Sequence, residues 1–516
     1  MNAIKMSLVA VTVCLIACVR AEGSEWKFQW PAVVPAVAEH ECRADVQVAL
    51  DADLAVEVTC ADGAKGAAWV AEKMSAWFGG LAFAARDVAG AADDLAENPE
   101  AYALEAEKGR LVIRARTLKG VRWAMMTLRQ IAQPVRGTFG RLAYEVPAFR
   151  VKDAPETAFR ALHLCAFPEV TIPRLEHGIR MAAYYKFNYV IVESWGVFRS
   201  ERQPWYGWKD GKLTVAECRR LAAVAQDLGV TLIPFFNVFG HATATRGKSG
   251  KNAILDTRPE YQGMFEPVAG FNWCLSNPHV RQVICDLVGE LHDAFGRPQY
   301  FHLGCDEADP PSCAACCAAD YGRLLADHVT ALADFVRRRG ARPMIWHDML
   351  VKEGDPRWKG FYAHGTDATV SLLDRLPKDV IICDWWYDDP PKDGKYPTLE
   401  HFRAKGFTTV TCPWDNVPGI VSQCDYARRN GLGVIGTTWN RFTSYRVWEM
   451  YPYSAAGAWS TAAARDVEKV AARYSTFLRD VFGTHWRQVG YDTPGVDTYS
   501  EFGYFTDQIG VSIHER

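Results

Sequence analysis

The stretch YFHLGCDE at residues 300–307 begins as a short aromatic and apolar segment and ends in two adjacent acids, Asp306 and Glu307. An apolar run of this length, bounded by glycine, is typical of a buried strand in a parallel sheet. Carboxyl groups are rarely buried without a partner, so two of them directly after a strand indicate a site at its carboxyl end. The stretch therefore predicts both a strand and the chemistry that follows it.

Seven other segments repeat this theme between about residues 158 and 460, each a short apolar strand followed by a longer helical segment. The alternation is typical of a parallel sheet wrapped by helices, and eight such units favour a closed (β/α)8 TIM barrel. The strands are predicted at residues 159–164, 188–192, 231–236, 300–303, 343–346, 380–383, 408–411 and 433–437.

The residues that follow these strands are polar and aromatic, and in this fold the loops after the strands form the active site. Loops are polar in most proteins, but carboxyl groups that collect at one end of the strands favour a site there. The predicted lining comprises Glu193, Trp195, Asn237, His241, Asp306, Glu307, His347, Asp348, Asp384, Trp385, Trp386, Tyr387, Trp414, Asp415, Trp439 and Asn440.

The barrel is assigned to residues 151–460, and a different pattern precedes it. Within residues 25–150, strand-like runs alternate with helical stretches and predict a small α+β domain. The residues from 461 to 516 begin as a helix and continue as a loop-rich, aromatic segment that we expect to cap the barrel.

The first 21 residues have the features of an export signal, with Lys5 ahead of an apolar run that is too short to span a bilayer. Residues 15–18 have the pattern of a bacterial lipobox ending at Cys18, whereas residues 19–21 suit an ordinary signal peptidase. Both cleavages stay open. The expected location is secreted, periplasmic or an outer-membrane lipoprotein anchored through lipid at Cys18.

The charge and aromatic content of the sequence indicate what kind of molecule the protein binds. The net charge of the 516 residues is −3, and no run of lysine or arginine occurs, which argues against nucleic acid and anionic membranes. Aromatic residues make up 12%, including 18 tryptophans, whose flat faces suit apolar sugar surfaces. A neutral glycan is therefore the expected partner, and the motifs call for no cofactor.

Fifteen cysteines are scattered along the chain, too sparsely for a dense disulfide framework. Cys313, Cys316 and Cys317 form the one local cluster, which could hold a metal or a local disulfide. A zinc site needs a fourth ligand that the spacing does not identify, so no metal is assigned to the site.

Residues 302–307 resemble the His-x-Gly-Gly-Asp-Glu signature of family 20 glycoside hydrolases, the β-N-acetylhexosaminidases, with Cys305 in place of the second glycine. The resemblance extends in order from about residue 100 to 440. Residues 101–104 and 120–130 resemble the small domain before these barrels, and residues 153–160 resemble the entry into the first strand. Residues 234–241 resemble the Pro-Glu-x-Asp-x-Pro-Gly-His segment, and an Asn-Pro at 277–278 precedes the next helix.

The resemblance implies removal of a terminal β-linked N-acetylhexosamine, GlcNAc or GalNAc, from a glycoprotein, mucin or polysaccharide glycan. The acetamide of the substrate would attack the anomeric carbon, so no enzyme nucleophile is needed. Glu307 would be the general acid, its pKa raised by an apolar pocket and by Asp306, which would stay ionised and hold the acetamide N–H. The resemblance also implies binding roles for Arg160 at the 3- and 4-hydroxyls, His241 beside Asp306, and Trp346, Trp385 and Trp439 around the acetamide and sugar face.

Several positions depart from the family pattern. Cys412-Pro413-Trp414-Asp415 stands where the family has the tyrosine that holds the acetamide oxygen, and Tyr387 is the substitute that the sequence offers. Asn440 stands where the family has a carboxylate that grips the outer sugar hydroxyls. These losses concern substrate choice and point to a divergent branch that reads a galacto configuration, or a modified or internal sugar.

Two other functions stay open. One is a retaining glycosidase in which Glu193 or Asp348 is the nucleophile for Glu307. The other is a non-catalytic glycan-binding lipoprotein, although a binder has no need of a proton donor.

Overall fold

The computed structural model describes residues 30–31, 33–90, 92–136, 142–166, 170–194, 196–207, 212–243, 254–268, 270–358, 362–439 and 445–465. The predicted export segment and most of the predicted C-terminal cap lie outside these residues. Trp195, Asn440 and Arg441 also lie outside them. Nowhere in the described ranges is there a helix with the length and apolar character needed to cross a bilayer.

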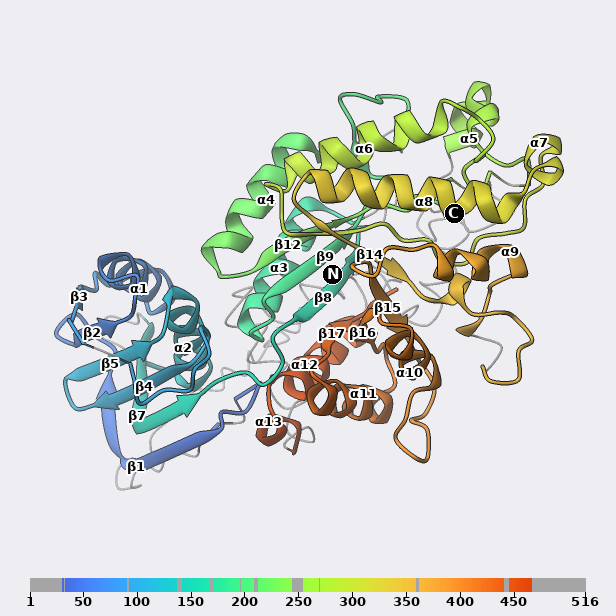
Figure 1. Ribbon diagram of the computed structural model, residues 1–516. Helices are drawn as coiled ribbons and strands as arrows, with labels where there is room; N and C mark the ends of the chain where they lie inside the picture. The colour runs from blue at the N-terminus through green and yellow to red at the C-terminus, as the bar shows by residue number, and fades with distance from the viewer. Residues whose placement is uncertain are drawn as a thin grey trace, which may run out of the picture.

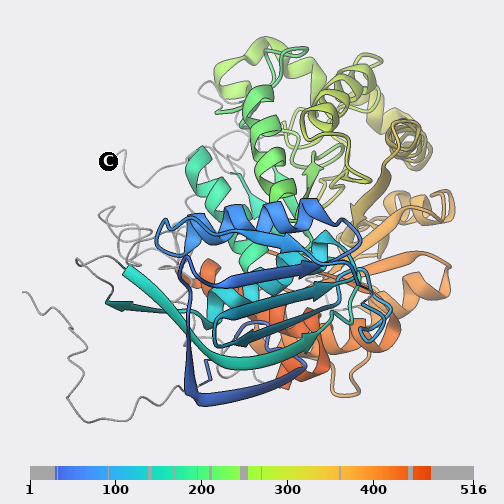
Figure 2. The same cartoon turned by 90° about the vertical axis from the view of Figure 1, so that its left-hand side faces the viewer.

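The N-terminal unit is a seven-stranded mixed sheet with two helices (Figures 1 and 2). Its strand order is β1-β7-β4-β5-β2-β3, with β6 paired to β7, and helices α1 and α2 contact the sheet. The elements are β1 (Glu39–Ala49), β2 (Ala55–Thr59), α1 (Ala64–Trp77), β3 (Ala85–Asp87), β4 (Tyr102–Glu107), β5 (Arg110–Ala115), α2 (Leu118–Ile131), β6 (Gln133–Arg136) and β7 (Leu142–Asp153).

A closed barrel of eight parallel strands follows, which confirms the predicted fold class. Strand β17 pairs with β8 and closes the barrel, with Val434 opposite Arg160 and Gly436 opposite Leu162. The strands are β8 (Arg160–Cys165), β9 (Tyr189–Glu193), β12 (Thr231–Phe235), β13 (Tyr300–His302), β14 (Arg342–Trp346), β15 (Ile381–Trp385), β16 (Thr408–Cys412) and β17 (Gly433–Gly436). Each overlaps a strand predicted from the sequence.

Helices surround the barrel, as Figure 1 shows. The longer ones are α3 (Ile172–Tyr184), α4 (Val215–Asp227), α6 (Val280–Ala294), α8 (Tyr321–Arg338), α10 (Pro397–Ala404), α11 (Val417–Asn430) and α12 (Tyr445–Trp459). Short elements within the loops are β10 (Phe198–Arg199), β11 (Leu213–Thr214), α5 (Ile254–Thr257), η2 (Pro259–Met264), α7 (Ala314–Ala318), η3 (Asp348–Leu350), α9 (Asp367–Val370), η5 (Ser371–Asp374) and α13 (Thr461–Arg465).

Local sequence explains where these helices begin and end. The side chains of Thr171, Thr214 and Asn416 each accept a hydrogen bond from a backbone N–H of the first turn of α3, α4 and α11, which satisfies a donor that the helix leaves unpaired. Helix α11 ends at Gly431, whose φ of 66° is a left-handed conformation that glycine adopts without steric cost.

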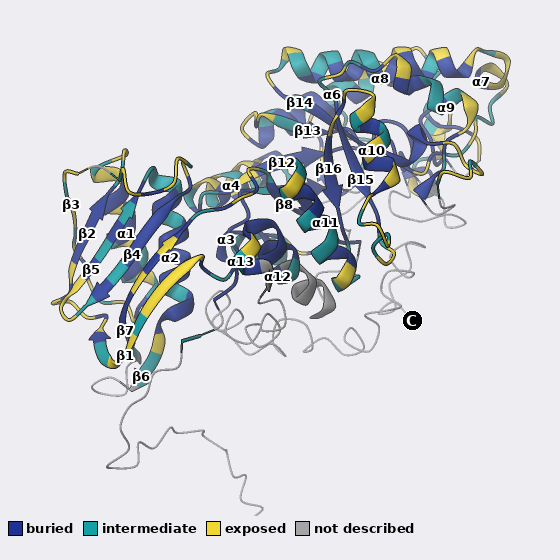
Figure 3. Ribbon diagram, turned by 60° about the horizontal axis from the view of Figure 1, so that its bottom comes forward, coloured by how far each residue is buried: buried dark blue, intermediate teal, exposed yellow. Residues whose placement is uncertain are grey.

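One continuous cluster of buried apolar residues extends from the small sheet into the barrel. The burial colouring of Figure 3 shows the barrel strands in dark blue, with exposed residues mainly on helices and loops. The two units share this core and a layer of buried polar contacts at the amino-terminal end of β8. The opposite end of the barrel therefore remains for the site.

Candidate active site

The backbone between β13 and the acid pair follows a tight, left-handed course. Gly304, Cys305 and Glu307 have φ of 68°, 74° and 45°. A Cβ on Gly304 would lie 1.7 Å from Oδ1 of Asn237, so only glycine fits there. The same Oδ1 accepts the backbone N–H of Cys305 at 3.1 Å. Non-glycine residues in this region cost about 1–3 kcal/mol each, and such strain concentrates at functional sites.

The acid pair lies around one imidazole. Nε2 of His241 is 3.2 Å from Oδ2 of Asp306 and 3.2 Å from Oε2 of Glu307. The His241 ring packs edge-on against Phe271, with 4.6 Å between ring centroids. The side chain of Asp306 is 7% exposed, whereas that of Glu307 is 45% exposed. One acid is therefore enclosed and the other is reachable from solvent, although the sequence predicted an apolar pocket around Glu307.

The carboxylate of Asp348 binds the backbone of Glu307. Oδ2 of Asp348, a fully buried side chain, accepts the backbone N–H of Glu307 at 2.9 Å and lies 3.0 Å from Nδ1 of His364. Burial opposes the charged form of His364, but the hydrogen bond to Asp348 and the charges of Asp348, Glu307 and Asp306 outweigh it and raise the pKa of His364. Burial raises the pKa of Asp348, and the nearby charge of Asp306 adds to the rise.

Five aromatic residues from the ends of four strands form a connected wall. The rings of Trp385 and Tyr387 stack at 5.2 Å, and Tyr387 meets Trp414 edge-on at 5.3 Å. The indole N–H of Trp439 donates to the hydroxyl oxygen of Tyr387 at 2.8 Å, and Trp346 lies 5.8 Å from Trp439. The sequence predicted all five as site residues, and the structure brings them together. His364 links this wall to the acid pair, because its ring lies 5.9 Å from that of Trp385.

Glu193 lies on the same face, at the carboxyl end of β9. Its Oε2 is 2.8 Å from Nε2 of His163, and the ring of His163 lies 4.8 Å from that of Trp439. Both side chains are buried, at 3% and 0% exposure. Glu193 thus contacts His163, whose ring packs against Trp439 of the aromatic wall.

Arg160 is placed elsewhere, and its predicted role at the sugar hydroxyls is corrected. It is the first residue of β8, so it lies at the amino-terminal end of the barrel, opposite the acid pair. Its guanidinium is ion-paired with Glu100 of the small domain and donates to the carbonyls of Thr157 and Lys186. The ring of Trp459 covers it at 4.9 Å. Arg160 therefore joins the two domains.

Asp384 and His347 do not join the acid pair among the described contacts. Both side chains are buried, and Nε2 of His347 is 4.0 Å from Oδ1 of Asp384. Burial raises the pKa of Asp384 to about 8 and lowers that of His347 to about 3. The two side chains are thus neutral at pH 7, as a structural pair would be.

Sequence reasoning did not identify His163 or His364 as site residues. His163 lies within β8, where side chains that point into the barrel alternate with those that point out, so the strand period was a usable signal. His364 lies in the long segment between β14 and β15, far in the sequence from the end of either strand. No sequence signal marked it.

A (β/α)8 barrel with two adjacent carboxyl groups and an aromatic wall at the carboxyl ends of its strands is the architecture of a carbohydrate-cleaving enzyme. The chain belongs to glycosyl hydrolase family 20. Residues 192–461 match the catalytic domain of this family, and residues 30–154 match its domain 2. The resemblance inferred from the sequence is thereby confirmed.

Individual relatives are distant. A β-N-acetylhexosaminidase of Cellulomonas fimi is 27% identical over 42% of this chain and 45% of that protein. A β-hexosaminidase of Vibrio furnissii is 22% identical over 67% of this chain and 58% of that protein. The chain thus spans about half the length of these relatives.

A solved structure of similar fold is the exo-β-N-acetylglucosaminidase of Vibrio harveyi in complex with N-acetylglucosamine. It matches with a TM-score of 0.66 over 89% of this chain and 79% of that one, at 17% identity. This likeness concerns the fold.

Proposed function

We propose that the chain is an exo-acting β-N-acetylhexosaminidase that removes terminal β-linked GlcNAc or GalNAc by substrate-assisted, retaining catalysis. The observation that carries the proposal is the placement of Asp306 and Glu307 around His241, 3.2 Å from each acid, at the rim of a family 20 barrel. The names of the relatives from Cellulomonas fimi and Vibrio furnissii support it.

The two acids divide the work according to their exposure. Glu307, half exposed, protonates the glycosidic oxygen as the acetamide oxygen of the substrate attacks the anomeric carbon. Asp306, enclosed beside His241, remains an anion that accepts the acetamide N–H and stabilises the oxazolinium ion. Water then opens this ion while Glu307 takes up a proton, which restores the starting state.

The aromatic wall supplies the matching sugar surface. Tyr387, partly buried and stacked on the buried Trp385, presents a flat apolar face, and its hydroxyl, fixed by the indole of Trp439, offers a polar group for the acetamide oxygen. We assign Trp414 and Trp439 to the same pocket, which the fully buried Trp346 supports by packing against Trp439. Glu193 acts through His163 and positions this wall.

The alternative mechanism, in which an enzyme carboxylate is the nucleophile, requires a second carboxylate that the substrate can reach. Asp348 is fully buried and accepts the N–H of Glu307, and Glu193 is buried against His163. Neither presents an oxygen to solvent, which favours the acetamide as nucleophile.

The test is hydrolysis of chromogenic β-GlcNAc and β-GalNAc by the wild type, Glu307→Gln and Asp306→Asn. Loss of one electrostatic stabiliser costs about 3 kcal/mol of barrier, so Asp306→Asn should lose roughly a hundredfold in kcat. A thiazoline that mimics the oxazoline should inhibit the wild type competitively. A sugar trapped covalently on Glu193 or Asp348 would establish the enzyme-nucleophile route, and glycan binding without hydrolysis by the wild type would establish a binding protein.

Export and lipidation belong to the same proposal, since a glycan-degrading enzyme must reach its polymer. The sequence LIAC at residues 15–18 supports acylation of Cys18 and an outer-membrane or periplasmic location. Labelling of producing cells with a fatty acid should mark the wild type and not Cys18→Ala. Absence of label from an exported wild type would favour cleavage by an ordinary signal peptidase.

A further inference from the structure

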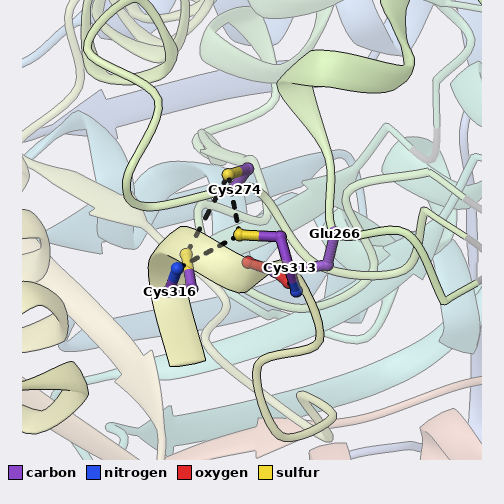
Figure 4. A group of neighbouring side chains, drawn as sticks. All are labelled: Glu266, Cys274, Cys313 and Cys316. Carbon is purple, nitrogen blue, oxygen red and sulfur yellow. Dashed lines mark hydrogen bonds between the residues drawn. The ribbon is translucent and has the colours of Figure 1, made fainter. Parts of the chain in front are cut away.

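Four side chains with metal-binding atoms converge on one point (Figure 4). Glu266 and Cys274 belong to the segment between β12 and α6, and Cys313 and Cys316 lie at the start of α7. One ligand atom of each lies within 4.8 Å of the others. The chain thus brings Cys313 and Cys316 to a third thiol and to a carboxylate about forty positions earlier in the sequence.

The spacing of the sulfurs fits ligands of one metal ion. Sγ of Cys274 lies 3.7 Å from Sγ of Cys313 and 3.9 Å from Sγ of Cys316. Two sulfurs at about 2.3 Å from a tetrahedral Zn²⁺ are separated by roughly 3.8 Å. A disulfide needs a separation of about 2.05 Å and would use only two of the three thiols. Two of the three sulfur separations thus match a tetrahedral ion, and the third, between Cys313 and Cys316, is within 4.8 Å.

Glu266 is oriented as a fourth ligand. Its Oε2 accepts the backbone N–H groups of Ser312 and Cys313 at 2.8 and 2.7 Å, and the hydroxyl of Ser312 at 3.2 Å. Its Oε1 is buried, and the carboxylate has the thiol of Cys316 as a neighbouring donor. A cation in place of that thiol proton would bind the carboxylate and the sulfur together.

The backbone is also prepared for a thiolate. The N–H of Cys316 donates to Sγ of Cys313 at 3.2 Å, and such a bond stabilises the deprotonated sulfur that binds a metal. Cys317, next in the chain, is not part of the cluster, because its exposed thiol donates instead to the carbonyl of Pro311 at 3.4 Å.

We propose that Cys274, Cys313, Cys316 and Glu266 bind one Zn²⁺ in a closed tetrahedral site. Three thiolates and a carboxylate suit this ion, and four protein ligands leave no position for a reacting water. The site is therefore structural, and it ties the loop that follows β12 to the loop that follows β13.

The two loops that the metal ion would join also carry the acid pair and His241. The loop after β12 carries His241, and Phe271, three residues before Cys274, packs on the His241 ring. The loop after β13 carries Asp306 and Glu307. Loss of the ion should therefore lower thermal stability and should disturb the alignment of the acid pair.

The first test is metal content and thiol state of the full chain, neither of which depends on hydrolysis. Elemental analysis should find about one zinc per chain, and mass spectrometry without reductant should show no disulfide among the three cysteines. A chelator should remove the ion and lower the Tm, and added ZnCl₂ should restore it. A disulfide between Cys274 and either other cysteine would overturn the proposal, as would iron or copper in the site.

Variants locate the ligands. Cys316→Ala and Glu266→Gln should each weaken zinc binding by about a hundredfold or more, whereas Cys317→Ala should bind as the wild type does. Glu266→Gln keeps all three thiols and so gives an answer even where Cys316→Ala fails to fold. Equal zinc content in Glu266→Gln and Cys317→Ala would exclude Glu266 as a ligand, and a wild type that takes up no zinc would end the proposal.

Discussion

The backbone N–H of Glu307 donates to Oδ2 of Asp348 at 2.9 Å, and this bond holds the proposed proton donor in a left-handed conformation with φ of 45°. The support comes from a neighbouring strand end, because Asp348 lies two residues after β14. The orientation of the acid thus depends on a fully buried side chain of another loop.

Removal of this support should impair the chemistry more than binding. We expect Asp348→Ala to lower kcat by at least tenfold, with a smaller change in KM, because Glu307 would shift away from the leaving oxygen. An unpaired buried donor should also cost about 1–3 kcal/mol of stability. Asp348→Asn should lie between wild type and Ala, because its amide oxygen still accepts the N–H.

Steady-state kinetics and thermal unfolding of both variants check this prediction. Asp367→Asn is the matched control, because the Asp367 side chain is 85% exposed. If Asp348→Ala lost stability and kept full kcat, the positioning role would be ruled out. If Asp348→Asn were as inactive as Glu307→Gln and azide restored turnover, Asp348 would be the nucleophile.

Asp384 should make the stability of the protein depend on pH. Burial raises its folded-state pKa to about 8, whereas an unfolded aspartate titrates near 3.9. The folded state therefore holds a proton that the unfolded state releases, and stability falls as pH rises from about 4 to about 8. Asp384→Asn lacks this loss, so we expect its Tm to exceed that of the wild type by an amount that grows over this range.

Thermal unfolding of the wild type and Asp384→Asn at pH 5, 6, 7 and 8 measures the effect. The same series on Asp367→Asn controls for the loss of a charge at the surface. A Tm difference that stayed constant, or shrank toward pH 8, would contradict a buried neutral acid at position 384.

The sequence was sufficient for the barrel and for most of the residues that the structure brings together at its carboxyl end. Each strand is a short apolar run that repeats at helix-plus-strand spacing, and the fold itself places the residues after each run at one end. Asp306, Glu307, Trp385, Tyr387, Trp414 and Trp439 followed from this rule, whereas Trp346 followed from the family resemblance. The same rule could have excluded Arg160, because the first residue of a strand lies at the opposite end.

Other features depend on contacts that the sequence does not encode locally. Cys274 and Glu266 are separated from Cys313 in the sequence by α6 and β13, so no local spacing pattern could assign them to the proposed metal site. Asp384 follows Cys383 and precedes Trp385 within β15, and adjacent strand side chains point to opposite faces. Counting both Asp384 and Trp385 as site residues ignored this alternation.

Tyr387 should contribute to the reaction through its hydroxyl. Because the Trp439 indole fixes this oxygen, we expect Tyr387→Phe to lower kcat/KM for N-acetyl substrates by about tenfold, the value of one hydrogen bond of about 1.4 kcal/mol. Tyr396→Phe is the control, because its hydroxyl bonds to Ser422 on α11. Equal kinetics for Tyr387→Phe and the wild type would remove the hydroxyl from the mechanism and leave only its ring as a sugar platform.

Substitution of Arg160 should change the stability of the fold without changing catalysis. Burial opposes ionisation of Glu100, but the charges of Arg160 and Lys119 lower its pKa to about 2. The pair should thus stabilise the fold above about pH 4.5, and this contribution should disappear as pH falls toward 2.

Arg160→Met leaves the carboxylate of Glu100 buried without its main partner, which typically costs about 3–5 kcal/mol. We therefore expect a Tm lower by many degrees at pH 7, a smaller deficit at pH 3, and an unchanged KM for the folded fraction. Arg150→Met, at a residue 62% exposed on the small domain, should change none of these. A raised KM with an unchanged Tm would return Arg160 to the sugar site, which its place at the start of β8 and its contacts with Glu100 argue against.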